Sequence, residues 1–112
     1  MLRHFKAEFF KTLAHASRIR IVDALREGER TVGDLQHQLK MEQSSVSQHL
    51  AILRSRDFVH SRREGTSVYY SVADPAIWQL LDIARDIYER QLGSNKANFE
   101  ALSARSTISS SA

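Results

Sequence analysis

The chain has 112 residues, which is enough for one domain with a single modest hydrophobic core. It carries 16 Lys and Arg against 13 Asp and Glu, and the resulting charge of +3 permits nucleic-acid binding without requiring it. The absence of cysteine excludes disulfides, thiolate metal sites and thiol redox switches. No apolar run approaches the roughly 18 residues of a membrane span, and the N-terminus lacks a signal-peptide core, so we expect a cytoplasmic protein.

Three helices are predicted before residue 40. Apolar residues at helical spacing predict an amphipathic helix over residues 3–14. Ser17 is a candidate N-cap for a second helix, which Gly28 ends. Thr31 is a candidate N-cap for a third helix, with Asp34 as the acidic member of a capping box.

A fourth helix begins at about Gln43 or Ser44 and has two contrasting faces. Val46, Leu50 and Leu53 form one apolar stripe at i, i+4 and i+7, typical of a helix that faces a core. The opposite side carries short hydroxyls and amides instead of Lys and Glu: Ser44, Ser45, Gln48 and Ser55. Such groups hydrogen-bond base edges and phosphates. Two short helices separated by a tight turn indicate a helix-turn-helix unit.

A hairpin and a long helix are predicted next. Residues 58–72 read as two strands around Gly65, and Asp74 with Pro75 begins a last helix that ends near Gly93. Phe99 and Leu102 form one more helical turn or extend that helix, and the Ser-rich tail from Ser103 is expected to be disordered. We therefore expect a DNA-binding and dimerisation domain over residues 1–93 and a short extension over residues 94–112.

Polar and basic residues of the fourth helix and the hairpin are the candidate DNA contacts. They are Gln43, Ser44, Ser45, Ser47, Gln48, His49, Arg54, Arg62 and Arg63. Gln48 is the best candidate for base readout because an amide pairs bidentately with adenine, and Ser44 and Ser45 are first assigned to phosphates. His49 has a structural or a phosphate-contacting role. Strand alternation places Arg62 and Arg63 on opposite faces, so we expect one to reach DNA and the other to pair locally, for example with Glu64.

The first and last helices carry more apolar surface than a domain of this size encloses. We therefore predict a two-fold dimer interface formed by both helices. Its candidate residues are Phe5, Phe9, Leu13, Ile77, Leu80, Leu81, Ala84, Ile87 and Tyr88. Trp78 belongs to the core, to this interface or to a lid over a small cavity, and the core is favoured.

Two strings carry a family resemblance, which extends over roughly residues 5–93. They are LAHxxRxRI, starting at Leu13, and QSSVSQHL, starting at Gln43, followed by Arg62-Arg63-Glu64-Gly65. The chain resembles the ArsR/SmtB family of small winged-helix repressors. The resemblance implies a homodimer, joined through the first and last helices, that represses transcription until a signal releases it.

The predicted fold is mostly α with a small β-hairpin, a winged helix-turn-helix of order α-α-α-α-β-β-α. Its expected partners are double-stranded DNA with a palindromic operator, a second copy of the chain, and an unidentified small-molecule or protein effector, with no membrane and no cofactor. No catalytic motif is present, so we expect no enzyme. Two alternatives stay open: a winged-helix protein-interaction module, and a metal-responsive repressor with a cysteine-free site such as His4 with Asp82 or Asp86. The missing cysteines and the lack of His on the last helix disfavour the metal site.

Overall fold

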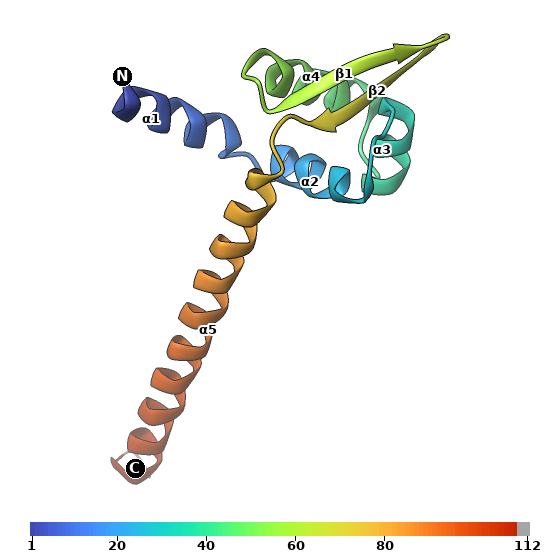
Figure 1. Ribbon diagram of the computed structural model, residues 1–112. Coiled ribbons are helices and arrows are strands. Elements are labelled where there is room, and N and C mark those ends of the chain that lie inside the picture. Colours follow the sequence, from blue (N-terminus) through green and yellow to red (C-terminus); the bar gives the residue numbers. More distant parts are fainter. Residues whose placement is uncertain (110–112) are drawn as a thin grey trace. The chain divides into compact units, whose positions relative to one another are not determined.

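The computed structural model describes the backbone of residues 1–109 and the side chains of residues 1–95 (Figure 1). The elements are α1 (Leu2–Leu13), α2 (Ala16–Ala24), the 3-10 turn η1 (Leu25–Glu27), α3 (Val32–Leu39), α4 (Gln43–Ser55), β1 (Val59–Glu64), β2 (Ser67–Val72) and α5 (Ala76–Ser109). The order is the predicted one. Contacts divide the chain into two compact units, Met1–Trp78 and Gln79–Ala112.

The core of the first unit joins α2, η1, α3, α4 and the start of the hairpin. The apolar stripe of α4 is completely buried, since Val46, Leu50 and Leu53 have no exposed surface. Buried residues of the other elements surround it: Ile21, Val22, Leu25, Leu35 and Val59. Within the same unit, α1 packs against this core through Phe9, whose ring centroid lies 4.8 Å from the ring centroid of Phe58.

The starts of α2 and α3 differ in how well local sequence predicts them. Thr31 and Asp34 form the expected capping box, with each side chain accepting a hydrogen bond from the other residue's backbone N–H. Ser17 is not the N-cap of α2, because that helix begins at Ala16 with His15 as an extended N-cap that makes no side-chain bond. The backbone N–H of Ile19 already bonds to the carbonyl of His15, so Ser17 lies inside the first turn.

The turn between α3 and α4 is only three residues long. Lys40 ends α3 in the left-handed conformation with φ 53°, although it is not a glycine. This conformation lets the N–H of Met41 bond to the carbonyl of Gln36, which satisfies one of the helix's unpaired C-terminal acceptors. α4 then begins at Gln43, as predicted.

β1 and β2 form an antiparallel hairpin that projects beyond the helices of its unit (Figure 1). Its register pairs Val59 with Val72 and Glu64 with Ser67, and Gly65 makes the turn with φ 62°. Two backbone hydrogen bonds join Arg30 to Tyr70, so the segment before α3 lies against β2. The base of the hairpin is therefore tied to the helix-turn-helix.

α5 starts where predicted and continues much further. The carboxylate of Asp74 accepts a hydrogen bond from the N–H of Ala76, which confirms its role as N-cap. The predicted end near Gly93 is wrong, since the helix runs to Ser109 and includes residues 103–109, which we expected to be disordered. A lone glycine costs a helix only about 1 kcal/mol relative to alanine, and no proline follows it. The side chains of Phe99 and Leu102 and the tail residues 110–112 lie outside the described parts of the chain.

Candidate nucleic-acid interface

The polar side chains over residues 43–48 of α4 are mostly exposed and are unpaired. Gln43, Ser44, Ser47 and Gln48 are exposed, while Ser45 is half-buried. Within the part of the chain that the structure describes, no side chain of these five makes a hydrogen bond. Their donors and acceptors are therefore free for an external partner. The buried stripe on the opposite side of α4 holds these groups in place.

The N-terminus of α4 adds backbone hydrogen-bond donors to this polar surface. The N-cap residue Glu42 makes no side-chain bond to the first turn. The N–H groups of that turn thus lack a side-chain acceptor and carry the partial positive charge of the helix dipole. Ser44 and Ser45 lie in this turn, which suits the phosphate contacts predicted for them.

The His49 side chain is bonded to α2. It is half-buried, and its Nδ1 accepts a hydrogen bond from Nε of Arg18 at 3.3 Å, so its neutral form carries the proton on Nε2. Burial lowers the pKa of His49, and the positive charge of Arg18 and the neighbouring His15 lower it further. This geometry assigns His49 to the support of α4.

Arg18 and Arg20 of α2 connect the helices around α4, a supporting role that the sequence did not indicate. Arg18 is only 9% exposed and donates from Nη1 to the carbonyl of Thr12, at the end of α1, at 2.8 Å. Arg20 donates from Nη2 to the carbonyl of Leu39, at the end of α3, at 2.6 Å. Both guanidinium groups thus satisfy helix C-termini and complement their dipoles. The available signal was the position of both arginines beside the buried apolar residues Ile21 and Val22 of a short helix.

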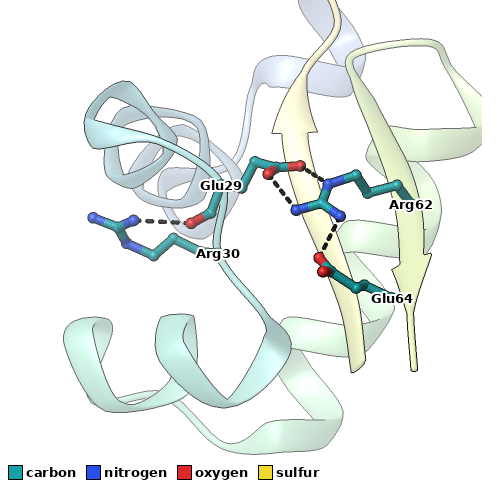
Figure 2. Close-up of polar contacts among 4 residues, drawn as sticks. All are labelled: Glu29, Arg30, Arg62 and Glu64. Carbon is teal, nitrogen blue, oxygen red and sulfur yellow. Dashed lines mark hydrogen bonds and ion pairs between the residues drawn. The ribbon is translucent and has the colours of Figure 1, made fainter. Parts of the chain in front are cut away.

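The two arginines of the hairpin have different surroundings. Figure 2 shows Arg62 between Glu29 and Glu64. Its Nε and Nη2 donate to the two carboxylate oxygens of Glu29 at 2.7 and 2.8 Å, and its Nη1 donates to Glu64 at 2.8 Å. The hydrogen bonds from Arg62 hold the pKa of the Glu29 carboxyl below its usual range. Arg63 is exposed and, among the described residues, has no hydrogen bond or ion pair. The expected local pair with Glu64 is therefore made by Arg62, and Glu29 is its stronger partner.

Arg54 is exposed in the last turn of α4 and makes no hydrogen bond or ion pair within the described chain. Its neighbour Arg56 lies 3.8 Å from the carboxylate of Glu8, an ion pair between α1 and the end of α4. The exposed face of α4 thus ends in one basic side chain that is available to a partner.

Comparison with known proteins agrees with this geometry. Residues 15–61 match the family of bacterial regulatory proteins described as arsR, a stretch that contains α2 to α4 and the start of the hairpin. The uncharacterised HTH-type transcriptional regulator Rv0081 of Mycobacterium tuberculosis is 45% identical over 104 residues, which cover 92% of this chain and 91% of that protein. The chain belongs to the arsR family.

Solved structures agree. The crystal structure of M. tuberculosis Rv0081 has a TM-score of 0.76 at 45% identity, over 84% of this chain and 95% of that one. The solution structure of a homodimeric winged helix-turn-helix DNA-binding domain from Mycobacterium bovis has a TM-score of 0.72 at 32% identity, over 81% of this chain and 84% of that one. Nodulation protein NolR of Rhizobium meliloti is 38% identical over 82 residues, which are 73% of this chain and 67% of NolR. The protein is thus a transcriptional regulator of the ArsR family, whose members bind DNA and form homodimers.

The residues expected at the dimer interface of this ArsR-family chain are not equally available. Leu13 and Ile77 are only 6% and 8% exposed, so they have little surface left for a second copy. Phe9 is half-buried against Phe58. The exposed members are Phe5, Ala84, Ile87 and Tyr88, and Leu80 and Leu81 are half-buried.

Trp78, for which a core role was favoured, is half-buried. Its indole N–H donates to the carbonyl of Val22 at 2.9 Å, which ties the start of α5 to α2. Arg26 adds a second link, since its Nη2 donates to the carbonyl of Trp78 at 3.3 Å. The predicted beginning of α5 is therefore part of the first unit.

The described residues lack two further kinds of site or segment. They contain no group of three or more His, Cys, Asp or Glu side chains arranged to hold a metal ion. Among the same residues, no helix combines the length and apolar character that a bilayer-spanning segment needs.

Proposed function

We propose that this ArsR-family protein is a cytoplasmic repressor that binds, as a homodimer, a two-fold symmetric operator with one α4 in the major groove of each half-site. The observation that carries the proposal is the contrast between the two faces of α4. Val46, Leu50 and Leu53 are completely buried, and the opposite face offers unpaired amides and hydroxyls. A rigid helix with such a face is suited to reading base edges.

The side chains of this surface have separate roles in the proposal. Gln48 reads a base, because its exposed amide offers one donor and one acceptor side by side. Ser44 and Ser45 bind a phosphate at the N-terminus of α4, with Gln43 and Ser47 beside them. Arg63 and Arg54 supply positive charge to the DNA backbone.

The exposed apolar residues of α1 and α5 support the dimer interface. Phe5 is 61% exposed, and Ile87 and Tyr88 are 43% and 62% exposed. Burying these side chains against a second copy removes apolar surface from water at about 25 cal/mol per Å². Sedimentation of an Ile87→Asp variant tests this role: we expect monomers, whereas Gln79→Asp, which changes an exposed polar residue on the other side of the same helix, keeps the dimer.

A release signal other than a transition metal fits the composition best. The chain has no thiolate ligand, and the acidic residues of α5 have no imidazole near them in the sequence. The remaining routes are a small organic effector, a partner protein, or control by protein concentration alone. Zinc, nickel, copper and arsenite titrated into a labelled operator complex should leave it bound; specific release by any of them near micromolar concentration would support the metal-responsive alternative.

Selection of bound sites from random DNA duplexes tests the whole proposal. We expect an inverted repeat whose half-site centres lie about 10 base pairs, or a multiple of that, apart. The logarithm of the binding constant should fall with the logarithm of salt concentration by about 0.9 per phosphate neutralised. An asymmetric site, or binding that does not depend on salt, would contradict the proposal.

A further inference from the structure

The hydrogen bonds of Arg62 leave little of this side chain for a DNA phosphate. All three of its guanidinium nitrogens donate to carboxylate oxygens, two to Glu29 and one to Glu64. The Tyr69 ring covers one face of the guanidinium, whose central carbon lies 4.8 Å from the ring centroid. Arg62 is half exposed, so its hydrogen bonds to the two carboxylates, and not burial, are what occupy the guanidinium.

The Glu29 contact has the geometry in which arginine binds phosphate. A guanidinium binds planar or tetrahedral oxyanions through two parallel N–H groups, and Glu29 accepts in this bidentate manner. A DNA phosphate that bound the Nε and Nη2 edge of Arg62 in this bidentate manner would have to displace the Glu29 carboxylate, and at any other edge it would meet the negative charges of Glu29 and Glu64. Arg63 has neither obstacle.

The connection of Glu29 to the rest of the fold makes the arrangement rigid. Glu29 precedes Arg30, whose backbone pairs with Tyr70 on β2. Arg62 lies on β1, opposite Tyr69 in the strand register. The Arg62 side chain therefore crosses β2 to reach Glu29, and the ion pair links both strands to the segment that leads into α3 (Figure 2).

From these contacts we infer that Glu29 is a positioning residue: its carboxylate keeps the Arg62 guanidinium away from DNA phosphates, so that Arg63 is the arginine through which the hairpin contacts the DNA backbone. This inference rests on the proposed DNA-binding surface. Phosphate contacts act on every sequence alike, so withholding one arginine per protomer lowers the affinity for operator and random DNA by the same factor and leaves base readout by α4 unchanged. Glu29 thereby sets the strength and the salt dependence of DNA binding.

Salt titrations of the full chain with an operator duplex and a random duplex test the inference. Glu29→Gln releases Arg62, and we expect the affinity for both duplexes to rise about tenfold, with the salt slope steeper by about 0.9 per protomer. Arg62→Ala should keep the wild-type slope, and the double variant Glu29→Gln/Arg62→Ala should return to it. Glu27→Gln is the matched control, because it removes an equal charge two residues away, from a side chain that pairs with Arg30.

Two results would overturn the inference. One is an equal change in Glu29→Gln and Glu27→Gln, which would mean that only net charge matters. The other is a loss of salt slope in Arg62→Ala, which would show that Arg62 leaves Glu29 and binds phosphate in the complex. If the wild-type protein bound no duplex in a salt-dependent way, the proposed function would fail instead. Circular dichroism of each variant confirms the fold.

Discussion

Helix α4 and the β1–β2 hairpin present polar groups to a partner in different ways. α4 is held by a stripe with no exposed surface, and its outer amides and hydroxyls are neutral and unpaired. The hairpin is held by backbone pairing and by one arginine bound to two carboxylates, and it presents a second arginine that is free. Hydrophobic packing thus fixes the groups suited to reading sequence, whereas ion pairing selects which charge is presented.

The largest effect is expected on the free energy of unfolding, from a substitution in the buried stripe of α4. Leu50→Ala removes a completely buried side chain and should lower the free energy of unfolding by about 2–5 kcal/mol. Ile52→Ala, two residues along the same helix and 37% exposed, should cost less than about 1 kcal/mol. Urea denaturation followed by circular dichroism measures both. Equal losses in the two variants would show that the buried stripe does not hold the helix.

Base readout by α4 is tested by Gln48→Ala. We expect preference to relax at one base pair of each half-site, by about 1–3 kcal/mol against the wrong base, because the amide makes that contact. Competition between operator variants measures the discrimination, with Gln91→Ala of α5 as the control. A uniform loss of affinity for all sequences would instead make Gln48 a backbone contact and move base reading to Ser44 or Ser47.

The hairpin's contribution is tested by Arg63→Ala. Because a phosphate contact carries no sequence information, affinity should fall similarly for every duplex and the salt slope should decrease by about 0.9 per protomer. Arg85→Ala removes the same charge from α5, where Arg85 pairs with Glu89 at 3.1 Å, and should keep the slope. Loss of discrimination at a single base pair in Arg63→Ala would contradict the assignment of base reading to α4 and of phosphate contact to the hairpin.

The smallest expected effect is the pH dependence of the free energy of unfolding that arises from His49 of α4. Burial lowers the pKa of His49 in the folded protein, whereas the unfolded chain keeps the ordinary value of about 6.5. Below that value the unfolded state binds a proton that the folded state does not, so the free energy of unfolding should fall as the pH falls. The slope is at most about 1.4 kcal/mol per pH unit, and it levels off below the folded pKa.

Denaturation at a series of pH values from 7.5 downward checks this dependence. His49→Gln should remove its share of the slope, since glutamine stays neutral at every pH. His37→Gln, which alters an exposed residue of α3, should retain the wild-type slope. An unchanged slope in His49→Gln would show that the bond from Arg18 does not couple protonation to folding.

Local interactions explain the features that were predicted correctly. The buried stripe of α4, the capping box of Thr31 and Asp34, the turn at Gly65 and the cap at Asp74 each depend on residues within about seven positions of one another. Their spacing is visible in the chain, so the order of helices and strands and the polar face of α4 followed from it. The family resemblance had the same origin, in one string that runs from the end of α1 into α2 and a second string at the start of α4.

Contacts between distant segments decided the rest. Arg62 and Glu29 are 33 residues apart, and Arg18 and His49 are 31 apart, so no spacing rule indicates either pair. Periodicity shows which face of a helix is apolar but not what covers it, which is why Leu13 and Ile77 were assigned to a dimer interface and are buried in the protomer. The amino-acid sequence alone therefore specified the order of the elements and the chemistry of the proposed DNA-binding face. Only the folded chain determined which arginine of the hairpin is free, because a charge pairs with whichever opposite charge the fold brings within reach.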